Sequence, residues 1–186
     1  MPETALNNFI AAAEKVGACV VQGQNTDTAA AYIAEHISSS LLFPPSPSLE
    51  RSGIRAALEK ASVSIVENDF RKRAPVAGGG LTGANFGIAD TGTVVLESTT
   101  EATRLASTLP EQHFVLLDPD KLVADGIEAV APLRALHQRD NQNYIAYITG
   151  PSRTADIERV LTIGVHGPKQ LHILLVSGLS DDLLEN

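Results

Sequence analysis

The apolar positions at the start of the chain alternate between helical and extended spacing. Apolar residues recur every three or four positions over residues 6–16, which predicts an amphipathic helix. Residues 18–22, which begin with the apolar run Ala-Cys-Val-Val, predict a short strand. A second helical stripe over residues 29–37 follows Thr26 and Asp27, either of which can cap its first turn. The order so far is helix, strand, helix.

The middle of the chain repeats this alternation after a proline-rich connector at residues 44–47. Residues 48–61 predict a third helix capped by Ser48, and residues 63–66 predict a buried strand. A continuous apolar run over residues 113–117 predicts another strand.

The last third of the chain is richer in strands than in helices. A helical pattern starts at Lys121 and is interrupted at Gly126 and Pro132. The predicted strands of this part are residues 144–148, 160–165 and 172–176. Residues 179–186 are acidic and are expected to fray.

The stretch 78–98 is the most distinctive of the chain. It opens with four glycines in six positions, predicted as a loop, and continues into two short runs that Asp90, Thr91 and Gly92 join as a hairpin. The glycines have two interpretations, which the sequence leaves open. They let strands pack closely, or their backbone N–H groups form an anion-binding nest that includes Gly79, Gly80 and Gly83. Thr91 and Gly92 of the hairpin are further candidates for ligand binding.

These elements together predict one α/β domain over residues 1–186. Strands alternate with helices in the first half, and strand pairs follow in the second. Such an order predicts a mainly parallel sheet with some antiparallel strands and helices on both faces.

Composition and charge narrow the classes of function. The formal net charge is -8, and aromatic residues make up 4% of the chain, with no tryptophan. Both features argue against a nucleic-acid-binding protein. No apolar run approaches the length of a membrane span and no secretory signal is visible, so a cytoplasmic protein is expected.

The chain contains one cysteine, Cys19. It lies in an apolar run and is expected to be a buried structural thiol. One thiol cannot hold an iron–sulfur cluster, which needs several thiolates. No iron–sulfur cluster is therefore expected in this chain, and no other cofactor or metal site is expected in it either.

The transition from a strand into residues 148–156 is the first candidate site. Gly150 permits a tight turn, Arg153 can fork onto a carboxylate or phosphate, and Ser152 and Thr154 offer hydroxyl groups. We expect ligands at such loops because they bind beyond the carboxyl ends of strands in open α/β sheets. The alternative is that Ser152 or Thr154 caps a helix whose dipole Asp156 and Glu158 complement.

Three further residues are candidates for chemistry. His166 and Lys169 form an ionisable pair in a turn, where a histidine is also commonly exposed or held in a structural hydrogen bond. Glu97 ends a central strand, where it can serve as a nucleophile or general base or can pair with Arg104. No Ser-His-Asp order, metal-ligand cluster or P-loop is present in the sequence.

Four segments of the second half resemble the LUD-domain family: residues 89–96, 107–110, 150–158 and 164–169, the last followed by Leu171 and His172. The run Gly-Pro-Ser-Arg-Thr-Ala-Asp-Ile-Glu at 150–158 is the most specific of them. The resemblance implies a three-layer α/β/α sandwich similar to the sugar-phosphate isomerase, CoA-transferase and formyltetrahydrofolate cyclo-ligase group.

The resemblance also implies a role in the oxidation of L-lactate to pyruvate in bacteria. Two partner proteins would carry the iron–sulfur clusters, and this chain would bind a small carboxylate or support the redox subunits. Arg153, Ser152 and Thr154 are the residues expected to hold the anion, and Glu97 and His166 those expected to transfer protons. The rivals are a freestanding cyclo-ligase- or CoA-transferase-like enzyme acting on a CoA, folate or phosphate-bearing substrate, and a non-catalytic sensor or scaffold. A homo-oligomer is left open.

Overall fold

A parallel β-sheet forms the centre of the molecule. The computed structural model describes residues 3–140, 142–154, 162–164 and 166–186. Within these residues the sheet has six strands, all paired in parallel. In spatial order they are β1 (Cys19–Gln24), β12 (Gln170–Val176), β7 (Gln112–Leu117), β4 (Gly79–Gly83), β2 (Leu41–Leu42) and β3 (Ile65–Val66).

Helices cover both faces of this sheet. Alternate side chains of each strand point to opposite faces, and apolar residues on both faces pack against helices. Phe114 and Leu116 of β7 pack toward α2 (Thr26–His36), α3 (Pro47–Ser52) and α4 (Ile54–Lys60). Val115 and Leu117 pack toward α1 (Glu3–Lys15) on the other face. The helix α6 (Glu101–Thr108) packs against β4 through Gly80. The layers are therefore helix, sheet and helix, as predicted.

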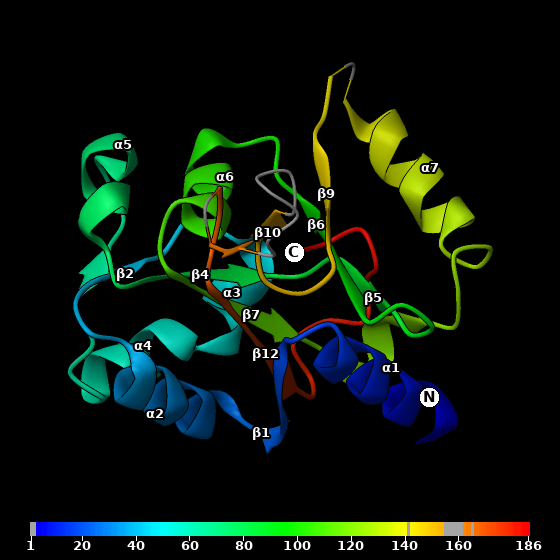
Figure 1. Cartoon of the computed structure of the whole chain (residues 1–186), viewed down its shortest axis with the longest axis horizontal. Coiled ribbons are helices and arrows are strands. Elements are labelled where there is room, and N and C mark those ends of the chain that lie inside the picture. Colours follow the sequence, from blue (N-terminus) through cyan, green and yellow to red (C-terminus); the bar gives the residue numbers. More distant parts are fainter. Residues whose placement is uncertain (1–2, 141, 155–161, 165) are drawn as a thin grey trace.

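A smaller mixed sheet lies beside α1 on the second face. Its order is β8 (Leu122–Val123), β5 (Phe86–Ile88), β6 (Thr93–Glu97) and β9 (Ile145–Ile148). The helix α7 (Val130–Arg139) packs on it through Leu136. In Figure 1, α7 and β9 lie at the upper right, and α2 and α4 lie together at the lower left. The remaining elements are α5 (Phe70–Arg73), two 3₁₀ turns (Ala74–Val76 and Pro119–Lys121) and the antiparallel pair β10 (Arg153–Thr154) and β11 (Thr162–Ile163).

The glycine-rich stretch is a strand, so its prediction as a loop was wrong. Gly79 and Gly80 pair with both β2 and β7. A Cβ atom on Gly80 would lie 2.0 Å from the carbonyl oxygen of Ala106, and one on Gly79 would lie 2.8 Å from the Phe114 ring. The structure favours the close-packing interpretation at these two positions, because only glycine lets α6 and Phe114 come so near.

Two predicted helices have different bounds. The third helix is divided into α3 and α4 at Gly53, whose φ of 76° is left-handed, and its cap is Ser46 rather than Ser48. The helix predicted from Lys121 begins at Val130 instead. Pro132 falls in the first turn of α7, where a missing N–H costs no intrahelical hydrogen bond.

The thiol of Cys19 is exposed, so its prediction as buried was wrong. Cys19 is the first residue of β1, and β1 lies at the edge of the parallel sheet. Its Sγ lies 3.3 Å from the hydroxyl of Tyr32. An apolar run at a sheet edge therefore does not bury every member.

Residues 179–186, which were expected to fray, contact the rest of the chain in the structure. Leu179 packs on the core beneath α2 and α4, and Leu183 and Leu184 pack on the core of the small sheet. We call residues 179–186 the C-terminal segment. It crosses the edge of the parallel sheet at which the strands end.

Candidate functional site

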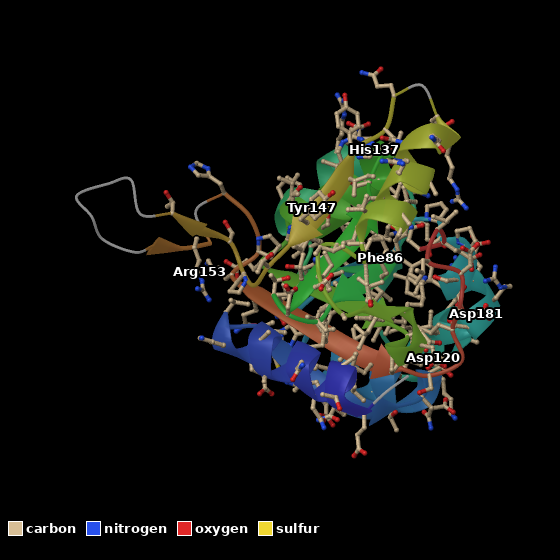
Figure 2. The ribbon with its side chains drawn as sticks, turned by 90° about the vertical axis from the view of Figure 1, so that its right-hand side faces the viewer. Phe86, Asp120, His137, Tyr147, Arg153 and Asp181 are labelled. Atoms are coloured by element: carbon tan, nitrogen blue, oxygen red, sulfur yellow. The ribbon has the colours of Figure 1, made fainter. Side chains whose placement is uncertain are left out.

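The two ends of the parallel sheet carry different polar groups. We call the end where β4, β7 and β12 finish the carboxyl edge, and the end where β7 and β12 begin the amino edge. Figure 2 shows Arg153 where β12 begins and Asp120 and Asp181 where it finishes. Ligands of open α/β sheets bind beyond the carboxyl ends of parallel strands, so the carboxyl edge is the natural place to look for a site.

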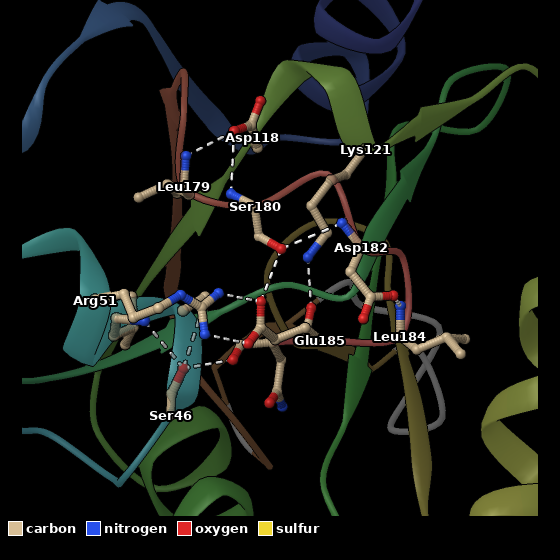
Figure 3. A network of polar contacts seen from close by, with 12 residues as sticks. Ser46, Arg51, Asp118, Lys121, Leu179, Ser180, Asp182, Leu184 and Glu185 are labelled. Atoms are coloured by element: carbon tan, nitrogen blue, oxygen red, sulfur yellow. Dashed lines mark hydrogen bonds and ion pairs between the residues drawn. The ribbon is translucent and has the colours of Figure 1, made fainter.

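Asp118 ties the C-terminal segment to the carboxyl edge. It directly follows β7 and is 3% exposed. Its Oδ2 accepts hydrogen bonds from the backbone N–H groups of Leu179 at 2.7 Å and Ser180 at 3.3 Å, as Figure 3 shows. Its Oδ1 accepts from the N–H of Asp120 at 3.0 Å. A buried carboxylate is thus satisfied entirely by backbone donors.

Glu185 is held by a forked ion pair at the same edge. Both terminal nitrogens of Arg51 donate to its two carboxylate oxygens, and Ser180 Oγ donates to Oε2 at 2.7 Å. The side chain of Glu185 is 17% exposed, against 56% for Arg51. The hydrogen bonds from Arg51 lower the pKa of Glu185 to about 2. The pair therefore holds the carboxylate in its ionised form.

Lys121 brings a second cation into this network and is 2% exposed. Its Nζ donates to the carbonyl oxygen of Ala84 at 2.9 Å and to that of Glu185. Burial lowers the pKa of Lys121 to about 8, and the nearby carboxylates of Glu185, Asp182 and Asp118 act in the opposite sense. A buried ammonium group is costly and needs such partners.

Asn186 fills the space between Ser46 and Glu97. The hydroxyl of Ser46 donates to its backbone oxygen at 2.6 Å, and its own Nδ2 donates to the backbone oxygen of Glu97 at 2.8 Å. A Cβ atom on Gly83 would lie 2.7 Å from the carbonyl carbon of Asn186. Of the predicted nest glycines, Gly83 is thus the one that faces this site.

Asn85 has an unsatisfied donor at the carboxyl edge. It is 1% exposed, and its Oδ1 accepts from the backbone N–H of Glu97 at 2.6 Å. Within the described part of the chain, its Nδ2 finds no hydrogen-bond partner. Asn85 and Asn186 therefore bind the same residue, one at its N–H and the other at its carbonyl.

The side chain of Glu97 turns back on its own chain. Its Oε1 accepts from the N–H of Thr99 at 2.8 Å. Arg104 donates to the carbonyl oxygens of Ser98 and Thr99. The structure thus places Glu97 next to the carboxyl-edge network through its backbone, with its carboxylate engaged in the following turn.

The described part of the predicted site at residues 148–156, namely residues 148–154, lies at the amino edge. The strand before it, β9, runs antiparallel to β6 in the small sheet, so the carboxyl-end rule does not apply to it. The N–H of Ser152 donates to the carbonyl oxygen of Pro168 at 2.9 Å. Arg153 and Thr154 form a strand and not a helix start. Asp156 and Glu158 lie outside the described residues.

The structure brings the predicted site residues after β9 close to the turn at residues 166–169, and both lie at the amino edge. A Cβ atom on Gly167 would lie 3.0 Å from the Cβ of Ser152. His166 and Gly167 line a hollow of about 450 Å³ together with Thr108, Leu109 and Gly164. Lys169 donates to Glu111 at 2.5 Å, with side chains 53% and 70% exposed. Glu97 is not part of this group.

Helix α1 and the residue that follows it pack closely against Gly92 and Gly150. A Cβ atom on Gly92 would lie 2.2 Å from the backbone nitrogen of Ala13, and one on Gly150 would lie 2.4 Å from the carbonyl oxygen of Val16. Thr91 belongs to a chain of hydroxyls that runs through Thr93 to Thr149, with 2.8 Å at each step. These residues join the hairpin to β9 and to α1.

The sequence reasoning missed Ser46, Arg51, Asn85, Asp118 and Lys121. The available signal was the run Asp118-Pro119-Asp120-Lys121, directly after a strand that was predicted correctly. Among the described residues, no group of three or more His, Cys, Asp or Glu side chains is arranged to hold a metal ion. No described helix is both long and apolar enough to cross a membrane.

Comparison with known proteins gives consistent matches. The LUD domain model matches residues 6–176. Lactate utilization protein C of Shouchella clausii is 34% identical over 129 residues, which are 67% of this chain and 56% of that protein. The protein of the same name from Bacillus subtilis is 32% identical over 149 residues, 74% of this chain and 62% of that protein. An uncharacterized protein of Neisseria meningitidis, NMB1437, is 40% identical over 97 residues, 52% of this chain and 41% of that protein.

The chain thus spans roughly half of the length of these relatives, between 41% and 62%. A crystal structure of a DUF162 family protein from Deinococcus radiodurans superposes with a TM-score of 0.66 at 20% identity. The superposition covers 93% of this chain and 96% of that one. It shows that the two chains share a fold.

Proposed function

The chain belongs to the LUD-domain family, and from this premise we propose that it serves bacterial L-lactate utilisation. In this role it acts with iron–sulfur partner proteins in the oxidation of L-lactate to pyruvate. The observation that carries the proposal is the similarity to Lactate utilization protein C from two bacteria, over 67% and 74% of this chain.

The proposed role of this chain is to bind a small carboxylate or to support the redox subunits. Its single cysteine, Cys19, supports a division of labour in which the clusters reside in the partners, since a cluster needs several thiolates. Arg153 is the residue proposed to hold the carboxylate at the amino edge, because its side chain is exposed and a guanidinium binds carboxylates in a fork. Ser152 and Thr154 would add hydroxyl donors.

Gene deletion in the native bacterium tests the role. We expect the deletion strain to stop growing on L-lactate as sole carbon source and to grow normally on glucose. A copy of the gene should restore growth. Normal growth of the deletion strain on L-lactate would contradict the proposal.

Thermal unfolding of the purified chain tests the ligand. At about 100 times its dissociation constant a ligand adds roughly 2.7 kcal/mol of stability, so L-lactate or pyruvate should raise the melting temperature by several degrees if either is bound. A rise with only CoA, ATP or a folate would favour a freestanding enzyme. The absence of any rise would favour a chain that works only within its complex.

A further inference from the structure

The carboxylate of Glu185 is bound as a ligand carboxylate would be. It lies at the carboxyl edge of the parallel sheet and receives two parallel N–H donors from Arg51. This fork is the geometry by which arginine recognises carboxylates. Lys121, which is 2% exposed, also donates to the backbone of Glu185. Two cations from separate parts of the chain therefore converge on one residue of the C-terminal segment.

We propose that the carboxyl edge is a binding site for a small carboxylate, built around Arg51 and Lys121 and occupied here by Glu185. When the ligand binds, its carboxylate takes the place of the Glu185 side chain and the C-terminal segment moves away. The inference does not rest on the lactate role, because the geometry recognises the carboxylate group and not the rest of the molecule.

Asn85 is the second, independent sign of a ligand. Its side chain is 1% exposed, and its Nδ2 has no partner among the described residues. Buried donors are nearly always satisfied in native proteins, so an unsatisfied one calls for an explanation. Asn85 binds the N–H of Glu97 while Asn186 binds the carbonyl of the same residue. Departure of Asn186 would therefore free the carbonyl oxygen of the residue whose N–H Asn85 holds.

The hydroxyl of Ser46 is a further donor that the ligand can use. It donates to the backbone oxygen of Asn186 at 2.6 Å and is 5% exposed. The C-terminal segment thus occupies donors of three kinds, namely a guanidinium, an ammonium and a hydroxyl group. Each can bind a carboxylate oxygen in place of the oxygen that it binds now.

Competition with Glu185 sets the affinity. A side chain tethered beside its site has an effective concentration in the millimolar range, so a free carboxylate binds weakly while Glu185 remains in place. Removal of the Glu185 charge should therefore strengthen binding. This expectation separates a site with an exchangeable occupant from a purely structural ion pair, whose loss only destabilises the protein.

The test compares the 186-residue chain with two variants that lose one charge each. Glu185→Gln removes the occupant, and Asp181→Asn removes an exposed carboxylate of the same segment. Acetate, pyruvate and succinate are the probes, titrated by calorimetry. We expect at least one probe to bind Glu185→Gln about tenfold or more tightly than it binds wild type or Asp181→Asn. The gain should disappear when Arg51→Met is added to Glu185→Gln.

A second measurement uses the wild-type chain and does not depend on a variant that folds. Hydrogen exchange of the Leu179 and Ser180 amides reports the C-terminal segment, because both donate to Asp118. An excess of the bound probe should accelerate this exchange. The proposal is overturned if a folded Glu185→Gln binds no probe more tightly than Asp181→Asn does. It is equally overturned if the probes leave the exchange of both amides unchanged.

Discussion

The amino and carboxyl edges of the parallel sheet differ in how exposed their charged side chains are. At the amino edge, the pair of Lys169 and Glu111 is formed by side chains 53% and 70% exposed. At the carboxyl edge, Lys121 is 2% exposed and Asp118 is 3% exposed. Exposed pairs contribute little to stability, whereas buried charges are costly and are tolerated only with full sets of partners.

This difference shows how the two candidate anion sites arise. The amino edge offers two exposed cations, Arg153 on strand β10 and Lys169 in its ion pair with Glu111. The carboxyl edge offers preorganised donors that the C-terminal segment already occupies. A sequence motif cannot reveal a site like that of the carboxyl edge, because its residues are distant in sequence. Arg51 and Glu185, for example, are 134 positions apart.

The largest expected effect concerns the glycines predicted to bind an anion. Gly80→Ala should lower the free energy of unfolding by about 3 kcal/mol, because overpacking of a rigid strand against a helix backbone is costly. The new Cβ would lie 2.0 Å from the carbonyl oxygen of Ala106. Urea denaturation measures the loss. Gly126→Ala is the control, since nothing lies within 4 Å of that position. An unchanged midpoint for Gly80→Ala would contradict the packing role.

The second effect compares one lysine from each edge. Lys121→Met should lower the free energy of unfolding by about 2 kcal/mol, because it leaves the carbonyl oxygens of Ala84 and Glu185 without the donor that they have now. Lys169→Met should cost less than about 1 kcal/mol, as is usual for an exposed pair. Both are measured by urea denaturation at neutral pH. Equal losses of unfolding free energy in the two variants would contradict the view that the buried lysine of the carboxyl edge contributes more to stability than the exposed lysine of the amino edge.

Most strands were predictable because their signals are local. The run 113–117 is continuous and apolar and forms most of β7, and Asp90, Thr91 and Gly92 join β5 to β6 as expected. The glycine-rich strand β4 was missed because glycine has low strand propensity, and the neighbours that require it, such as Ala106, are known only from the fold.

The carboxyl-edge site was not predictable because its contacts are long-range. Asp118 and Leu179 are 61 positions apart, and Lys121 and Glu185 are 64 apart. Taken alone, residues 179–186 have the composition of a fraying tail, and only the completed sheet supplies the partners that order them. At the amino edge, Ser152 and Gly167 belong to two motifs that were predicted separately, and the fold brings them together.

The third prediction concerns the pH dependence of stability, in which histidines of the parallel strands and the carboxyl edge act in different pH windows. Burial lowers the pKa of His113 to about 3 and that of His172 to about 4. In the unfolded chain both imidazoles become protonated near pH 6.5, whereas in the folded protein they stay neutral at that pH. The unfolded state then binds more protons, and stability falls as the pH drops below that value. We expect a loss of about 1 kcal/mol between pH 7 and pH 6.

The carboxyl edge should respond in a lower window. The pKa of Glu185 is about 2 in the folded protein and 4.5 ordinarily, so its contribution is complete above pH 4.5 and is lost toward pH 2. Urea midpoints across pH measure both windows. His113→Gln should reduce the slope between pH 7 and pH 6 and leave the lower window unchanged. A flat profile between pH 7 and pH 6 would contradict the burial of neutral imidazoles.

The smallest effect on stability is expected for Arg153→Ala. Arg153 is exposed, and substitutions at such positions usually change stability by less than about 0.5 kcal/mol. Its proposed role is ligand binding, so any rise in melting temperature that L-lactate or pyruvate gives to the wild type should vanish in this variant. Arg51→Met is the matched change at the carboxyl edge. If Arg153→Ala keeps the rise and Arg51→Met loses it, the carboxylate binds at the carboxyl edge and not at the hairpin, because the two guanidinium groups lie at opposite ends of the sheet.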